Sequence, residues 1–266
     1  MTEFDTAGRR GFSSRNALLA TPLRCRRSGP RIAAPADARA VELRGGLTVV
    51  RVSGMSEDER GGSAVVVLHG WGAAGDDLVP LAEALKRPGA RFFIPAAPLP
   101  VVGGGRGWWH LDPSTRPPHA STDQLAPGFM PSAAVVAARS AVQALIATVV
   151  DRYAPTMVAL VGFSQGAMLA IDVALAGAPG VQLVVGMSGV LLMDSVSTLT
   201  APHATKPLFL LSHGCQDPVV PFSSGKCAKD LLEKHGFFVT WRPFEGGHEI
   251  PSPLLAEVAQ FLFPPP

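Results

Sequence analysis

Residues 162–166, Gly-Phe-Ser-Gln-Gly, constrain the fold of this chain more than any other part of its sequence. The apolar residues 157–161 before them predict a buried strand, and residues 165–176 after them have the apolar spacing of a helix. A serine between two glycines at such a junction is typical of a sharp turn that exposes the hydroxyl at the carboxyl end of the strand. A serine that only caps the helix is the alternative, but a cap does not require the second glycine.

Strand-like runs alternate with segments of helical spacing along the chain, which is typical of a mostly parallel sheet with helices on both faces. We predict strands at residues 40–43, 47–52, 64–68, 91–94, 157–161, 183–187, 208–212 and 238–242. We predict helices at residues 78–86, 132–152, 165–176, 224–235 and 253–262. The first two strands flank Arg44, Gly45 and Gly46, a composition suited to an antiparallel hairpin at the sheet edge. A length of 266 residues suits one α/β domain of this kind.

Two segments fall outside this alternation. Residues 1–38 combine Arg, Pro, Gly and Ala without periodicity, so we expect a flexible tail there and a folded domain over residues 39–266. Arg9 and Arg10 loosely resemble a twin-arginine export signal, but the short apolar stretch behind them runs into further arginines instead of a cleavage site. Residues 96–131 are rich in Pro and Gly, and we expect this long loop to cover the functional site.

Composition excludes several function classes. Residues 1–44 hold nine Arg against four Asp or Glu, which leaves 14 basic against 17 acidic residues in the remainder. This mildly acidic remainder lacks the basic stripe that a nucleic acid would require, so we expect no nucleic-acid partner. Three cysteines do not resemble a disulfide framework and favour a cytoplasmic protein. No stretch of about 18 uninterrupted apolar residues predicts a transmembrane segment.

Ser164 needs two partners if it is to act as a nucleophile. A hydroxyl is a weak nucleophile, so a histidine must take its proton and an acid must orient that histidine. In this strand-turn-helix context the chain order is serine, acid, histidine. His248 lies in the loop between the last predicted strand and the last predicted helix, where the base belongs. The alternative, His235, ends a helix, where a cation is ordinarily structural. We therefore predict Ser164 as nucleophile and His248 as general base.

Asp217 is the predicted acid. It lies just after the predicted strand 208–212, at the carboxyl edge of the sheet and beside the expected position of His248. Asp194, after the preceding strand, is the competing acid. An aspartate before a proline is also common in turns, which is the structural alternative for Asp217.

Acyl transfer further requires two backbone N–H groups that point at the developing oxyanion. One should belong to Gln165, directly after the nucleophile. Residues 68–72, Leu-His-Gly-Trp-Gly, form a loop after an early strand, and their glycines let the backbone approach a substrate. We predict Trp71 as the second donor. His69 in the same loop precedes Ser164 and ends a strand, which argues against it as the base.

Together these motifs resemble the phospholipase/carboxylesterase family of α/β-hydrolases, which includes the acyl-protein thioesterases. The resemblance spans residues 63–263 and rests on four segments: 68–72, 162–166, 213–221 (His-Gly-Cys-Gln-Asp-Pro-Val-Val-Pro) and 247–250 (Gly-His-Glu-Ile). It implies an α/β-hydrolase fold with little or no cap domain, and a small esterase that needs no metal and no organic cofactor.

The predicted function is hydrolysis of carboxylic esters or thioesters through an acyl-enzyme, with a small-molecule ester or a lipid-like substrate. Carboxylesterase, lysophospholipase and acyl-protein thioesterase activities all stay open. Trp108 and Trp109 could line the substrate pocket, or one of them could close the core beneath the loop. A catalytically silent fold used as a binding module and a serine peptidase are the alternatives, although all three triad positions are filled. The sequence does not define the oligomeric state.

Overall fold

The computed structural model describes residues 39–43, 47–56, 58–111, 132–199, 201 and 206–265. The predicted tail over residues 1–38, the hairpin turn at residues 44–46 and most of the predicted covering loop, residues 112–131, lie outside this part of the chain. The boundary between tail and domain therefore stays a prediction.

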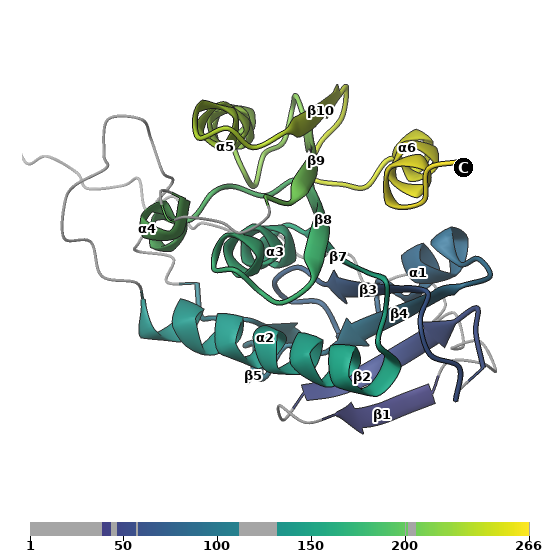
Figure 1. The fold of residues 1–266 in the computed structure, drawn as a ribbon. Helices are drawn as coiled ribbons and strands as arrows, with labels where there is room; N and C mark the ends of the chain where they lie inside the picture. Colours follow the sequence, from purple (N-terminus) through teal and green to yellow (C-terminus); the bar gives the residue numbers. More distant parts are fainter. Residues whose placement is uncertain are drawn as a thin grey trace, which may run out of the picture. The chain divides into compact units, whose positions relative to one another are not determined.

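An eight-stranded sheet lies at the centre of the described fold (Figure 1). Its strands, in spatial order, are β1 (Arg39–Leu43), β2 (Leu47–Ser53), β4 (Ala90–Pro95), β3 (Ser63–Leu68), β7 (Met157–Phe163), β8 (Val181–Met187), β9 (Leu208–Gly214) and β10 (Val239–Phe244). β2 pairs antiparallel with both β1 and β4, and all other neighbours are parallel. The predicted edge hairpin and the mostly parallel sheet are confirmed.

Helices cover both faces of this sheet (Figure 1). One face carries α2 (Ala133–Tyr153), α3 (Gln165–Leu175) and α5 (Phe222–Lys234), and the other carries α1 (Val79–Leu85) and α6 (Ser252–Leu262). The buried apolar side chains form two clusters, one on each side of the sheet. Along β3, Val66 and Leu68 belong to the α2–α3–α5 cluster, whereas Val65 and Val67 belong to the α1–α6 cluster. This alternation follows from the two-residue period of a strand.

The predicted strands and helices all occur, and their ends differ from the observed ones by two residues or fewer. The sequence interpretation missed β5 (Leu99–Pro100), β6 (Arg106–Gly107), the 3-10 turn η1 (Met193–Ser195) and α4 (Val196–Leu199). These elements have two to four residues each, too few to produce a readable hydrophobic period. β5 and β6 form a small antiparallel pair within the predicted covering loop.

By length and apolar composition, α2 could cross a membrane, and it is the one such helix in the described part of the chain. The core helix of a globular protein meets the same criterion. Its buried side chains, from Val135 to Tyr153, belong to the cluster that it shares with α3 and the sheet. We therefore interpret α2 as a core helix, and the expectation of no transmembrane segment stays a prediction.

Candidate active site

Ser164 lies in the turn between β7 and α3, with φ of 54° and ψ of −119°. A positive φ is uncommon for a residue with a side chain and costs on the order of 1–3 kcal/mol, so the surroundings must hold it in place. The Ser164 N–H donates to the Met187 carbonyl on β8 at 2.9 Å. Its carbonyl accepts the N–H groups of Ala167 and Met168 at 3.0 and 3.1 Å, which begins the helix. The turn therefore presents the serine at the N-terminus of α3.

The two glycines of this turn are required by close backbone contacts. A Cβ atom at Gly162 would lie 2.3 Å from the Gly166 carbonyl oxygen, because the strand and the helix cross closely there. A Cβ atom at Gly166 would lie 2.1 Å from the Leu68 carbonyl oxygen at the end of β3. Both distances are too short for any side chain. A serine that only caps a helix would not need this geometry.

Asp217 and His248, which are 31 residues apart, form a direct contact. The His248 Nδ1 atom lies 2.7 Å from Asp217 Oδ2. The other carboxylate oxygen, Oδ1, accepts the N–H groups of Val219 and Val220 at 2.8 Å each. Burial works to raise the pKa of Asp217, but the hydrogen bonds from His248 and from the two backbone N–H groups outweigh it and lower the pKa below its usual value. The carboxylate is thus held ionised and aimed at one imidazole nitrogen.

Parallel pairing brings the loops of both residues to the edge where Ser164 lies. β9 and β10 end next to each other, and their loops interlock: Cys215 N–H donates to the Phe244 carbonyl at 2.8 Å, and Gln216 N–H to the Gly246 carbonyl at 2.9 Å. On the other side, the His248 ring lies against the ring of Phe163, the residue before Ser164, with 4.8 Å between ring centroids. All three predicted triad residues therefore gather at the carboxyl edge of the sheet.

A second imidazole, to which the sequence interpretation gave no role, lies beside Asp217. His213, the penultimate residue of β9, is fully buried, and its Nε2 lies 2.9 Å from the Val220 carbonyl and 3.5 Å from Asp217 Oδ2. Because a carbonyl only accepts, Nε2 carries the proton. Burial lowers the pKa of His213, which keeps the ring neutral. A Cβ atom at Gly225 would lie 2.2 Å from its Nδ1, so the glycine makes room for the ring.

The early loop predicted to supply an oxyanion donor lies next to the nucleophile. A Cβ atom at Gly70 would lie 3.3 Å from the Ser164 Cβ. The Gly72 N–H already donates to the Arg106 carbonyl at 2.9 Å. Neither the Trp71 N–H nor the Gln165 N–H has an acceptor within the described residues. These two predicted donors are therefore available at the same edge.

His69, in this loop, is buried and contacts the segment that follows β4. Its Nε2 accepts the Ala97 N–H at 2.9 Å, so its proton lies on Nδ1, which donates to the Gly70 carbonyl at 2.8 Å. Burial lowers its pKa, and both ring nitrogens are engaged by the backbone. This arrangement leaves no nitrogen to serve as a base, in agreement with the sequence interpretation.

Trp108 and Trp109 are both buried in the α2–α3–α5 cluster, at 1% and 8% exposure. The Trp108 N–H donates to the Gln165 Oε1 at 2.8 Å, and its indole N–H donates to the His69 carbonyl at 2.9 Å. The Gln165 Nε2 donates to the Trp109 carbonyl at 2.9 Å. For Trp108 these contacts favour the core alternative; a role of either residue in substrate binding stays a prediction.

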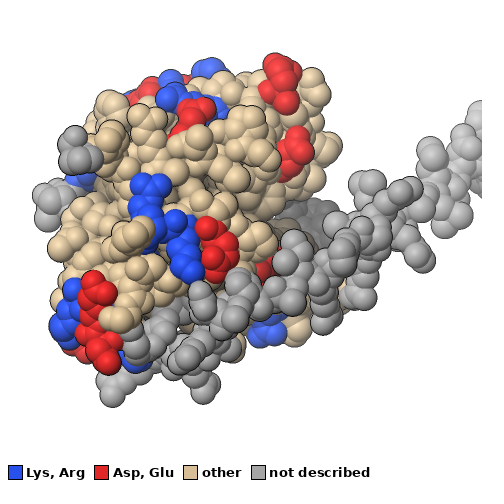
Figure 2. Space-filling model, turned by 90° about the vertical axis from the view of Figure 1, so that its right-hand side faces the viewer, with Lys and Arg blue, Asp and Glu red and all other residues tan. Residues whose placement is uncertain are grey.

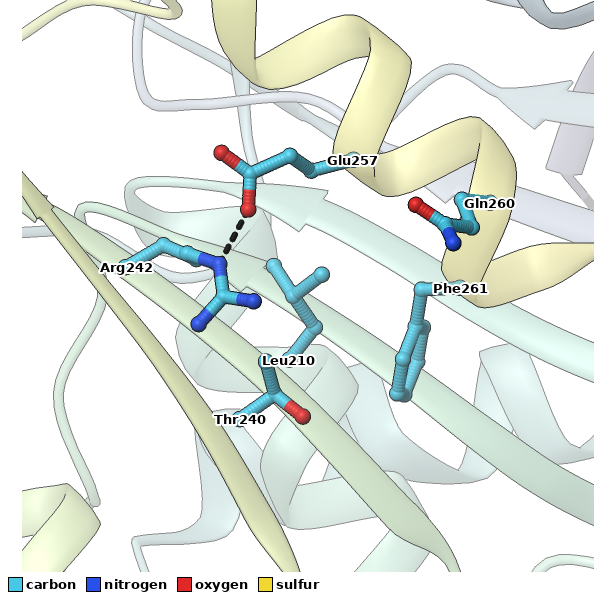
Figure 3. A pocket seen from close by; sticks show the side chains of 6 residues that line it. All are labelled: Leu210, Thr240, Arg242, Glu257, Gln260 and Phe261. Carbon is cyan, nitrogen blue, oxygen red and sulfur yellow. Dashed lines mark hydrogen bonds and ion pairs between the residues drawn. The ribbon is translucent and has the colours of Figure 1, made fainter.

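Two further features of the described residues are a charged surface and a cavity. On the face shown in Figure 2, Lys and Arg side chains stand beside Asp and Glu instead of forming a continuous basic stripe. A cavity of about 230 Å³ lies between β9, β10 and α6, where Arg242 contacts Glu257 (Figure 3). None of its lining residues is a predicted site residue. Within the described ranges, no group of three or more His, Cys, Asp or Glu side chains could hold a metal ion.

Comparison with known proteins identifies relatives of this fold and site. The family model described as Phospholipase/Carboxylesterase matches residues 54–263. Acyl-protein thioesterase 1 of Gibberella zeae is 32% identical over 114 residues, 41% of this chain and 48% of the relative, so this match spans about half of that relative's length. Acyl-protein thioesterase 1 of Emericella nidulans is 28% identical over 188 residues, 65% of this chain and 77% of the relative.

Solved structures agree. Esterase PE8 is 29% identical with a TM-score of 0.68, covering 81% of this chain and 97% of its own. The carboxylesterase from Mesorhizobium loti has a TM-score of 0.67 at 22% identity, covering 86% of this chain and 100% of its own, a likeness that shows the fold alone.

The sheet, its covering helices and these neighbours define an α/β-hydrolase. Because the family model matches most of the chain, this protein belongs to the phospholipase/carboxylesterase family, as the sequence resemblance predicted. It is a hydrolase of the esterase and thioesterase type.

Proposed function

We propose that this protein hydrolyses carboxylic esters or thioesters through an acyl-enzyme on Ser164, with His248 as general base and Asp217 as the orienting acid. One observation carries the proposal: the 2.7 Å contact between His248 Nδ1 and Asp217 Oδ2, at the sheet edge where Ser164 adopts a strained turn. Since Nδ1–H donates to the carboxylate, Nε2 is left without a proton and is free to accept one. Nucleophile, base and orienting acid thus each have a candidate in the required order.

In the acylation step, Ser164 Oγ attacks the carbonyl carbon of the substrate while its proton passes to His248 Nε2. The tetrahedral intermediate collapses, and His248 returns that proton to the departing alcohol or thiol. Water then gives a proton to His248 and attacks the acyl-enzyme carbonyl. The bond between Ser164 Oγ and the acyl carbon breaks, His248 returns the proton to Ser164 Oγ, and the carboxylic acid leaves. Asp217 fixes the tautomer of His248 and stabilises the imidazolium that forms in each half-reaction.

The N–H groups of Trp71 and Gln165 are the proposed donors to the oxyanion. Gln165 begins α3, so its N–H lies at the positive end of that helix. Donors fixed before the reaction stabilise the charge that develops in the transition state without reorganising. The proposed steps use side chains and backbone groups of this chain together with one water molecule.

We propose a small-molecule ester or a lipid-like ester as substrate. The names of the relatives, acyl-protein thioesterase and esterase, support both oxygen and sulfur leaving groups. Trp109, which is 8% exposed, remains the proposed contact for an apolar acyl chain. The mixed charge of the face in Figure 2 supports the view that nucleic acid is not a partner.

We further propose a cytoplasmic protein with a tail over residues 1–38 and one hydrolase domain over residues 39–266. The low cysteine content supports a reducing compartment, and Cys215 is an exposed free thiol.

The test is hydrolysis of p-nitrophenyl esters and acyl thioesters of graded chain length by the wild type and by Ser164→Ala, with folding of both checked by circular dichroism. We expect wild-type turnover that disappears in the folded Ser164→Ala variant. The acyl chain length that is hydrolysed fastest would indicate the length of the acyl pocket. A folded wild type that is inert on every ester and thioester but cleaves peptides would support the peptidase alternative. A protein inert on all three would support the silent binding module.

A further inference from the structure

We propose that Trp108 is a positioning residue that fixes the distance between the two oxyanion donors. The inference rests on the proposed function, because it takes the Trp71 and Gln165 N–H groups as those donors. They lie on separate segments, 94 positions apart in the numbering, so something must set their spacing. An oxyanion donor works at about 2.7–3.1 Å from the developing charge, so a small displacement of one segment weakens the site.

One side of the connection reaches the loop that carries Trp71. The Trp108 indole N–H donates to the carbonyl of His69, two residues before Trp71, at 2.9 Å. The ring centroids of Trp108 and His69 lie 5.4 Å apart. The segment just before Trp108 adds to this contact. Arg106 exchanges two backbone hydrogen bonds with the loop, accepting from Gly72 at 2.9 Å and donating to Ala73 at 2.7 Å.

The Trp71 ring is packed against the same segment. A Cβ atom at Gly107 would lie 2.4 Å from the Trp71 ring, so the glycine lets the backbone approach the indole closely. The backbone of residues 105–108 therefore holds the Trp71 loop by hydrogen bonds and by packing.

The other side of the connection reaches the residue after the nucleophile. The Trp108 backbone N–H donates to Gln165 Oε1 at 2.8 Å, and Gln165 Nε2 donates to the Trp109 carbonyl at 2.9 Å. Gln165 is 2% exposed, so both hydrogen bonds are formed away from water. The side chain of Gln165 is thus bound at two points to the segment whose indole binds the other loop.

Trp108 is therefore the shared residue of two hydrogen-bonded contacts, one to each half of the proposed oxyanion hole. Its 1% exposure leaves almost no surface for a substrate. Burial alone would require some acceptor for the indole N–H. It would not require an acceptor in the loop of Trp71 together with the paired amide contacts of Gln165. The arrangement explains why a tryptophan, and not a phenylalanine, stands at this position.

The experiment compares Trp108→Phe, which removes the indole N–H and keeps an aromatic ring, with Gln165→Met, which removes the side-chain amide and keeps the backbone N–H. Trp241→Phe, a partly buried tryptophan on β10, is the matched control for loss of an indole. In the full-length enzyme we expect kcat to fall about 10- to 100-fold in both test variants, with KM nearly unchanged. This loss is smaller than the roughly 10²- to 10³-fold fall in kcat that follows complete removal of an oxyanion donor. Trp241→Phe should keep kcat.

Binding of a boronic acid or trifluoromethyl ketone provides a second readout, because these compounds form a tetrahedral adduct with the serine. Their affinity should fall in proportion to kcat/KM. The double variant should lose less than the product of the two single losses, since both act on one connection. Trp108→Phe with a lowered melting temperature but wild-type kcat and inhibitor affinity would overturn the proposal. A wild type without Ser164-dependent activity would instead overturn the proposed function.

Discussion

At the scale of single residues, the acid of the site is surrounded by groups that control charge. Asp217 accepts one imidazole hydrogen bond and two backbone hydrogen bonds, and a second imidazole, His213, lies 3.5 Å from the same carboxylate oxygen. His213 is buried and neutral, and its Nε2–H donates a hydrogen bond to the Val220 carbonyl. His213 therefore closes the loop that carries Asp217 without placing a competing cation beside it.

His213 should make stability depend on pH. Its folded-state pKa is lowered by burial, so on acidification the unfolded chain binds a proton before the native protein does. The folded state therefore loses stability as the pH falls from about 6.5, the pKa of histidine in the unfolded chain, to the lower pKa of His213 in the folded protein. His213→Gln keeps an N–H donor but does not titrate. Between pH 7 and 5 we expect the unfolding free energy to fall more steeply with decreasing pH in the wild type than in His213→Gln. The difference between the two slopes should be at most about 1.4 kcal/mol per pH unit.

Urea denaturation at several pH values measures both slopes. His69 has a pKa lowered by burial in the same direction, but it is present in both proteins and cancels from the comparison. Parallel stability curves for wild type and His213→Gln would contradict the assignment of a buried, neutral His213.

At the scale of elements, a buried ion pair connects the helix of the nucleophile to its neighbours. Asp172 on α3 is fully buried and receives two hydrogen bonds from the Arg139 guanidinium on α2, at 2.7 and 2.8 Å. Ser195 in η1 donates a third at 2.8 Å. The charge of Asp172 is thus compensated by groups from two other elements, which fixes α3 and its N-terminal turn between them.

Removing one partner of this pair should be costly. Arg139→Met leaves the Asp172 carboxylate buried with one hydrogen bond from Ser195, so we expect a loss of about 3–5 kcal/mol of unfolding free energy. The control is Lys226→Met, which breaks an exposed pair with Asp230 on α5 and should cost less than about 1 kcal/mol. Chemical denaturation of both variants gives the comparison. Equal, small losses would show that the buried pair does not stabilise the α2–α3 contact.

Sequence patterns predicted the long elements well and the contacts between them poorly. The strands and the helices that cover them show clear hydrophobic periods of two and 3.6 residues. The 162–166 motif predicts the position of the nucleophile because close backbone contacts require its two glycines. The Asp172–Arg139 pair and the Gln165 amide depend on which elements pack together. No local pattern marks such partners. β5 and β6 are formed by only two residues each and leave no periodic signal.

At the scale of the whole molecule, the strand order explains how distant loops meet. β7, β8, β9 and β10 are consecutive parallel neighbours, so the turn after β7 and the loops after β9 and β10 all reach one edge. The loop after β3, the other neighbour of β7, joins them there. A site assembled from four loops thus follows from the topology once the parallel order is known.

The tail predicted for residues 1–38 should contribute little to this assembly. Its composition lacks the periodicity of a packed element, and the family match begins only at residue 54. Deleting residues 1–38 should therefore leave the melting temperature and ester turnover nearly unchanged, as measured by calorimetry and steady-state kinetics on both proteins. A large loss of either would place part of this segment in the fold.

The most direct test of the account is covalent labelling of the full-length protein with a fluorophosphonate, followed by mass spectrometry of its peptides. The reagent reacts with a serine only when a base activates it and the surrounding N–H groups stabilise the adduct. The account predicts one adduct, on Ser164, that is lost in Ser164→Ala and strongly slowed in a folded His248→Asn variant. A folded wild type that stays unlabelled, or an adduct on another residue, would contradict the assignment of Ser164 as the activated nucleophile.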